Sequence, residues 1–249
     1  MRTRIQVKDK LIVALDTSSE QEAVKLVEKL SEHVGYFKIG LELFTSCGPK
    51  IIEVIKDKGN KVFFDGKFLD IPNTVAKAVA NLVRHRVDML NLYMTGGIKM
   101  LQEAKSSLND AAVRYNLQPP KLLGVTVLTS LTADTLKNDL KVQSQIDEYV
   151  LHLAMIAFTN SLNGIICSPN EAKLIRDALK ARSRDVDSFL IVTPGVRPSW
   201  SKAHDQERIA TPKEAILNGA SHIVVGRPIT EAKDPQDAVK RILDEIGEL

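Results

Sequence analysis

Residues 61–74 read KVFFDGKFLDIPNT, an apolar run that is interrupted by charges at the point where a buried strand should end. Side chains two residues apart on a strand share a face, so Asp65 and Lys67 are expected to point the same way. Asp70 follows past the strand, and Pro72 closes the loop. Buried charges are costly unless they are paired, and clusters of them are typical of active sites. The segment therefore predicts a catalytic centre at the end of a strand.

A plainer interpretation of this segment is an ion pair that stabilises a strand end, with Asp70 or Asn73 capping the next helix. Two earlier segments weaken that interpretation. The run LIVALD ends on Asp16, and the run YFKIG carries Lys38. Three consecutive strands would thus supply four ionic side chains to one region of the molecule.

Short β-branched runs alternate with amphipathic helical stretches at intervals of about 25 to 30 residues, which is the pattern of repeated βα units. We expect strands at 11–16, 36–40, 61–67, 87–94, 121–128, 164–168, 189–193 and 222–226. Eight parallel strands suit a closed barrel of about 250 residues. The sequence therefore predicts an α/β protein in which residues 1–249 form a single (β/α)8 TIM barrel domain.

Predicted helix starts agree with this spacing, because capping residues follow several of the strands. A Ser, Thr or Asp is followed by proline at the first helical position or by a reciprocal Glu or Gln. The pattern occurs at Ser18 or Ser19, at Ser168 with Pro169 and Glu171, at Thr211 with Pro212 and Glu214, and at Asp234 with Pro235.

Composition excludes several classes of protein. The net charge is +3, from 34 basic and 31 acidic residues dispersed along the chain, so we expect no nucleic-acid partner. The first apolar stretch is too short for a signal peptide or a membrane span, so we expect a cytoplasmic protein with no membrane partner. Cys47 and Cys167 are isolated and the histidines are scattered, so neither a disulfide framework nor a metal site is expected.

The loops after the seventh and eighth predicted strands have the composition of a phosphate site. Barrel enzymes often bind phosphate with these two loops. The first carries Arg197, Gln206 and Arg208, and the second begins with Gly226 and Arg227. Glycine lets backbone amides approach an anion, and arginine offers a fork of donors. The alternative is a solvated loop with ordinary surface arginines.

Taken together, these segments resemble the orotidine 5′-monophosphate decarboxylase family over nearly the whole chain. The DxKxxD pattern alone is shared with related sugar-phosphate enzymes, whereas its combination with the other motifs is specific. The matching motifs are VALD at 13–16, Lys38 with GLELF at 40–44, DGKFLDIPNT at 65–74, GVTVLTS at 124–130, TPGVRP at 193–198, DQ at 205–206 and GRPIT at 226–230.

The resemblance implies cofactor-independent decarboxylation of orotidine 5′-monophosphate to uridine 5′-monophosphate in pyrimidine synthesis. Lys67 would protonate C6 of the pyrimidine after carbon dioxide has left. Asp65 would lie beside the substrate carboxylate and Lys38, while Asp16 and Lys38 would hold the ribose hydroxyls. No metal or organic cofactor is implied.

The resemblance also implies a homodimer in which Asp70, with Ile71 and Thr74, reaches into the partner's site. Thr129 or Ser130 would bind the pyrimidine edge, and Gln206 would bridge base and phosphate. The remaining substrate-binding residues implied are Pro194, Arg197, Gly226 and Arg227.

Two residues depart from the family pattern. Gly66 stands where a larger aliphatic residue is expected, and its side chain would point away from the lumen, so stability and rate are in question. Tyr93 stands where histidine is expected, which alters a contact near the fourth strand.

Two other functions remain open. A phosphosugar decarboxylase or synthase of the same superfamily would use the DxKxxD pattern around a divalent metal. A nucleotide-binding module that has lost catalysis, with Gly66 as the damage, would keep the phosphate residues.

Overall fold

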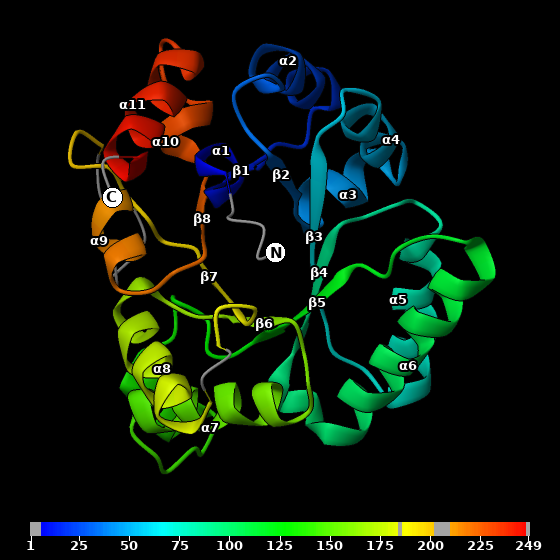
Figure 1. The fold of residues 1–249 in the computed structure, drawn as a ribbon, viewed down its shortest axis with the longest axis vertical. Helices are drawn as coiled ribbons and strands as arrows, with labels where there is room; N and C mark the ends of the chain where they lie inside the picture. The colour runs from blue at the N-terminus through cyan, green and yellow to red at the C-terminus, as the bar shows by residue number, and fades with distance from the viewer. Residues whose placement is uncertain (1–5, 184–185, 202–209, 248–249) are drawn as a thin grey trace.

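The computed structural model describes residues 6–183, 186–201 and 210–247. Within these residues, eight parallel strands close into a barrel in sequence order (Figure 1). The strands are β1 Leu11–Ala14, β2 Tyr36–Ile39, β3 Lys61–Phe68, β4 Met89–Tyr93, β5 Lys121–Val125, β6 Gly164–Ile166, β7 Leu190–Thr193 and β8 His222–Val225. The ring closes because β8 pairs with β1, Ile223 lying beside Leu11. The predicted (β/α)8 barrel is thereby confirmed.

All eight predicted strands exist, but most of them end earlier than predicted. The β5 strand shows the reason, because its last ladder pair joins Val125 to Ile166 while Val127 is still 5% exposed. The apolar residues beyond the last hydrogen-bonded pair line the mouth of the barrel. An apolar run therefore continues past the end of the strand and does not show where the strand ends.

Helices surround the barrel, as Figure 1 shows. They are α1 Val7–Lys10, α2 Glu20–Leu30, α3 Leu41–Cys47, α4 Lys50–Asp57, α5 Pro72–Val83, α6 Gly97–Tyr115, α7 Ile146–Thr159, α8 Pro169–Arg182, α9 Pro212–Leu217, α10 Arg227–Thr230 and α11 Pro235–Gly247. A 3-10 turn at Met94–Gly96 and a π-helical turn at Thr135–Asp139 lie in the connections.

The predicted caps occur at the helix starts. Ser19, rather than Ser18, caps α2 and accepts a hydrogen bond from the Glu22 amide at 3.3 Å. A reciprocal capping box opens α9, and at the start of α8 the Glu171 carboxylate accepts a hydrogen bond from the Ser168 backbone amide at 2.7 Å. These caps satisfy backbone amides that have no partner within the helix, so they fix where each helix leaves its βα loop.

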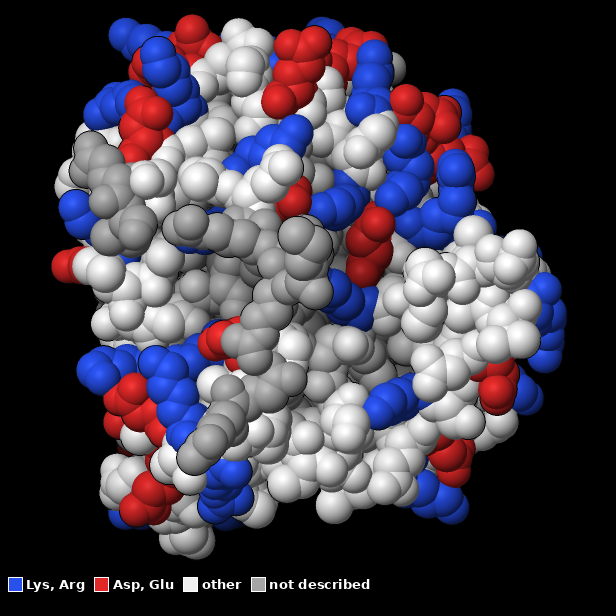
Figure 2. Space-filling view, viewed as in Figure 1, with Lys and Arg blue, Asp and Glu red and all other residues white. Residues whose placement is uncertain are grey.

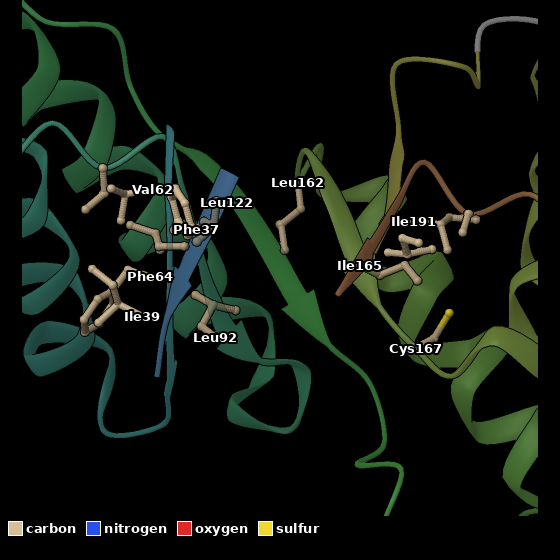
Figure 3. Packing of buried hydrophobic residues seen from close by; sticks show 14 of the residues in the cluster. Phe37, Ile39, Val62, Phe64, Leu92, Leu122, Leu162, Ile165, Cys167 and Ile191 are labelled. Atoms are coloured by element: carbon tan, nitrogen blue, oxygen red, sulfur yellow. The ribbon is translucent and has the colours of Figure 1, made fainter. Parts of the chain in front are cut away.

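The buried apolar residues form two layers, because alternate side chains on each strand face opposite sides of the sheet. The inner layer fills the barrel and includes Ile12, Phe63 and Met89. The outer layer lies between strands and helices; Phe64 and Ile39 lie in it close to each other (Figure 3). This alternation places Phe63 inside and Phe64 outside, and it leaves the lumen face for Asp65.

Charged side chains of both signs are interspersed over the face seen in Figure 2, and its described residues show no extended area of one sign. Across the described ranges, no helix has the length and apolar character needed to span a membrane.

Candidate functional site

A cavity of about 280 Å³ opens at the carboxyl ends of the strands. This is the end at which barrel enzymes hold their chemistry. The residues singled out from the sequence that line it are Asp16, Lys38, Asp65, Lys67, Thr129, Ser130, Pro194, Arg197, Gly226 and Arg227. Segments that lie far apart in the sequence therefore meet at one site.

Four ionic side chains form a chain of alternating sign along this cavity. Lys38 Nζ lies 2.8 Å from Asp16 Oδ1 and 3.4 Å from Asp65 Oδ2. Lys67 Nζ lies 2.7 Å from Asp65 Oδ1. Asp65 is therefore held between two ammonium groups. The spacing in the sequence predicted its proximity to Lys67, and the resemblance to the family implied its proximity to Lys38.

Burial and charge act in opposite directions on the two innermost groups. Burial favours the neutral form of Asp65, but the charges of Lys38 and Lys67 outweigh it and hold the pKa of Asp65 below its ordinary value. Burial likewise opposes the charge on Lys38, yet Asp65 and Asp16 raise the pKa of Lys38 above its ordinary value. Both groups consequently stay ionised at neutral pH.

The backbone of β3 is irregular where these charges lie. Phe64 pairs with Leu90 and Phe68 pairs with Leu92, so β3 advances four residues while β4 advances two. The backbone angle φ of Lys67 is +48°, which lies in the left-handed region that residues other than glycine rarely adopt. Such strain costs about 1 to 3 kcal/mol and is concentrated at functional sites. The expectation that Asp65 and Lys67 lie together is confirmed, but a bulge brings them together rather than a regular strand.

Asn91 on β4 belongs to this network although the sequence analysis did not single it out. Its Nδ2 donates to Asp65 Oδ1 at 2.7 Å, and its Oδ1 accepts from the Lys67 backbone amide at 2.7 Å. Met89 belongs to the inner layer and Tyr93 packs against it, so Asn91, which lies between them in the alternation, also faces inward. A polar residue at an inward strand position was the signal in the sequence that could have identified it.

Gly66 does not leave a void. A Cβ built at Gly66 would lie 2.5 Å from Phe64 Cε1 and 3.2 Å from Phe68 Cε2. The two phenylalanine rings stack with their centroids 5.9 Å apart, and Phe44 packs edge-on against Phe64. Position 66 therefore faces the outer layer, as expected, and aromatic rings occupy the space of the missing side chain.

Tyr93 is half-buried at the end of β4 and packs against the inner layer. Burial, and then the charge of Asp65, raise the pKa of Tyr93. The phenol thus stays neutral beside the ionic chain.

Asp70, Ile71 and Thr74 do not line the cavity. All three are exposed, and among described residues the Asp70 carboxylate accepts one hydrogen bond, from the Ile71 amide at 2.6 Å. Ile71 itself occupies the N-cap of α5 and no side chain caps that helix. The interpretation in which Asp70 or Asn73 caps the helix is therefore wrong.

The residues predicted to bind phosphate lie at the ends of β7 and β8. Pro194 and Arg197 follow β7, and Gly226 directly precedes Arg227 at the start of α10. A Cβ at Gly226 would lie 3.3 Å from Asp16 Oδ2, so glycine lets this turn approach the ionic chain. Gln206 and Arg208, predicted for the same site, lie outside the described residues.

In the parts of the chain that the structure describes, no group of three or more His, Cys, Asp or Glu residues is arranged to hold a metal ion. Cys47 and Cys167, the two cysteines of the sequence, are not joined by a disulfide.

Comparisons with known proteins agree on one family. The family model described as "Orotidine 5'-phosphate decarboxylase / HUMPS family" matches residues 9–242. An orotidine 5'-phosphate decarboxylase from Nostoc sp. is 45% identical over 238 residues, covering 96% of this chain and 97% of the relative. The enzyme of that name from Moorella thermoacetica is 45% identical over 243 residues, covering 98% of this chain and 94% of the relative.

The fold agrees with a solved structure as well. The crystal structure of orotidine 5'-phosphate decarboxylase from Lactobacillus acidophilus superposes with a TM-score of 0.82 at 38% identity, covering 96% of this chain and 99% of that one.

Proposed function

The chain belongs to the orotidine 5'-phosphate decarboxylase / HUMPS family, and we propose that it converts orotidine 5′-monophosphate to uridine 5′-monophosphate without a metal or organic cofactor. The observation that carries this proposal is the chain of alternating charge in a cavity that is also lined by the residues predicted to bind phosphate. The residues involved are Asp16, Lys38, Asp65, Lys67, Arg197, Gly226 and Arg227.

Direct decarboxylation leaves an electron pair at C6 of the pyrimidine, on an sp² carbon with no adjacent carbonyl to delocalise it. Fixed charges must therefore supply most of the stabilisation. The ammonium of Lys67 is already held by Asp65 at 2.7 Å, so it needs no reorganisation as charge develops at C6. Lys67 then protonates C6 once the bond to carbon dioxide has broken.

Asp65 has a second role in this proposal. Its side chain is only 12% exposed and stays ionised, so it would lie against the substrate carboxylate with little water to screen the repulsion. Loss of carbon dioxide relieves that repulsion, which favours the forward reaction.

The rest of the nucleotide is held along the same cavity. Asp16 and Lys38 hold the ribose hydroxyls, and the Thr129 or Ser130 hydroxyl bonds the pyrimidine edge. Binding energy far from C6 helps to position the reacting carbon. The phosphate contacts come from Gly226 and Arg227, with Pro194, Arg197 and Gln206 completing the site.

We further propose a homodimer in which Asp70 enters the partner's cavity with Ile71 and Thr74. Asp70 is exposed, and no ion pair joins it to Lys67 among the described residues. Its neighbours Leu69 and Ile71 are 55% and 66% exposed. Exposed apolar side chains on both sides of a carboxylate suit a subunit interface.

Residues 1–249 would act as one domain in the cytoplasm. The family match across residues 9–242 supports one domain, and two cysteines that are not joined by a disulfide suit a reducing compartment.

The test is the ultraviolet absorbance of orotidine 5′-monophosphate with purified protein in excess EDTA. Stoichiometric formation of uridine 5′-monophosphate at an unchanged rate supports the proposal. Activity that EDTA abolishes and divalent metal restores would favour the metal-dependent sugar-phosphate chemistry of the superfamily. Nucleotide binding without turnover would favour the binding module.

A further inference from the structure

The Asn91 side chain connects the two residues on which the proposed reaction depends. It is 0% exposed, and both ends of its amide are used inside the network. Its oxygen accepts a hydrogen bond from the backbone N–H of Lys67, and its nitrogen donates one to Asp65 Oδ1, each at 2.7 Å. One side chain on β4 therefore fixes both a backbone position and a carboxylate on β3.

The backbone contact matters because of the bulge. Between the pairs Phe64 with Leu90 and Phe68 with Leu92, Asn91 faces three residues of β3. Lys67 holds φ +48° at this point, a conformation that persists only where the surroundings enforce it. The hydrogen bond from the Lys67 amide to Asn91 Oδ1 is such a constraint.

The carboxylate contact matters because Asp65 Oδ1 is shared. The same oxygen accepts from Lys67 Nζ and from Asn91 Nδ2, while Oδ2 faces Lys38 at 3.4 Å. Two donors on one oxygen fix the rotation of the carboxylate, and with it the position of the Lys67 ammonium.

We propose that Asn91 is a positioning residue that holds Lys67 and Asp65 in the geometry needed for decarboxylation. This inference rests on the proposed function of the site. Asn91 need not touch the substrate. Without it, the bulge relaxes and the ammonium moves away from the reacting carbon.

Asn91→Ala tests this, with Asn60→Ala as the matched control. Asn60 is also a buried asparagine, 5% exposed, and its Nδ2 donates to the Ser31 and Val34 carbonyls, away from the cavity. Both variants lose stability. Only Asn91→Ala should lose kcat, by about a hundredfold, because misplacement by about 1 Å costs about that much. The Kd for uridine 5′-monophosphate should stay within about threefold of wild type.

Asn91→Asp tests the positioning role through the pH dependence of kcat, which would not change if Asn91 only stabilised the fold. The carboxyl group that this change introduces offers one donor and one acceptor when it is protonated, as the amide does, whereas its ionised form repels Asp65. The kcat of this variant relative to wild type should therefore rise as pH falls. This comparison also serves if Asn91→Ala fails to fold.

A third measurement does not depend on turnover. Hydrogen exchange at the Lys67 amide should be faster in Asn91→Ala than in wild type, and unchanged in Asn60→Ala. An Asn91→Ala variant with kcat within about twofold of wild type would overturn the proposal, as would a pH-independent ratio for Asn91→Asp. A wild-type protein without decarboxylase activity would instead count against the proposed function.

Discussion

Lys67 and Asp65 form a 2.7 Å ion pair across a single intervening residue, at a point where β3 leaves regular pairing with β4. The bulge, with Lys67 at φ +48°, sets where the two side chains leave the backbone and allows them to meet on one face. Asn91 holds the Lys67 amide and the Asp65 carboxylate at 2.7 Å each, so the geometry of the pair depends on β4 as well as on β3.

Lys67→Ala should abolish turnover while nucleotide binding remains measurable. Loss of one preorganised hydrogen-bond donor costs about a hundredfold to a thousandfold in kcat, and here the proposed proton donor is lost as well. The residues proposed to bind phosphate are untouched, so the Kd for uridine 5′-monophosphate, measured by calorimetry, should remain in the measurable range. Near-normal turnover in this variant would contradict the mechanism.

Mixing Asp70→Ala subunits with Lys67→Ala subunits should restore activity that neither variant has alone. In a mixed dimer, one site regains both residues. Random exchange at equal amounts makes half of the dimers mixed, each with one intact site, so about a quarter of wild-type activity is expected. The measurement is turnover after refolding the mixture. Each variant refolded alone is the control. If the subunits exchange and no activity is recovered, the proposal of a site shared between subunits is wrong.

Gly66→Leu and Phe64→Leu should each destabilise the protein, and the double variant should lose less than the sum. The leucine at 66 collides with the Phe64 ring, while leucine at 64 leaves space beside Phe44. Each single change is expected to cost about 1 to 3 kcal/mol. Urea unfolding gives the three free energies, and additivity to within about 0.5 kcal/mol would show that positions 64 and 66 do not share one space.

Stability should fall as pH falls from 6.5 towards 4, partly through His222. Burial, and then the charge of Lys121, lower the pKa of His222 from 6.5 to about 4. In this interval the unfolded chain binds a proton that the folded chain does not, so acid favours unfolding, by up to about 3 kcal/mol.

His222→Phe removes the titration and keeps a ring against Tyr36, which packs edge-on with His222 at 5.7 Å. The free energy of unfolding of this variant should vary less between pH 6.5 and 4. His152→Gln, at an exposed position, is the control and should keep the wild-type slope. An identical slope in His222→Phe would contradict this assignment.

The barrel could be predicted from periodic patterns in the sequence, and much of the cavity could be predicted from charges at strand ends, from the composition of two loops and from the resemblance to a family. Apolar runs with capping residues located every strand, and charges at strand ends located Asp16, Lys38, Asp65 and Lys67 at one mouth. These features need no knowledge of which side chains meet across the sheet.

Contacts across strands could not be predicted in the same way. The bulge depends on the pairing of β3 with β4, and the role of Asn91 depends on that bulge. The packing at Gly66 likewise depends on ring orientations that no spacing rule specifies. Strand identity is local information, whereas register and rotamers are not.

The rings of Phe64 and Phe68 over Gly66 also constrain how this segment can evolve. The three residues fill one space together, so their total volume should be constrained rather than the volume at any single position. A change at 64 or 66 alone passes through an overpacked or an underpacked intermediate, so selection should act on the two positions jointly. Homologous sequences should accordingly show covariation between them, a small residue at 66 accompanying an aromatic one at 64.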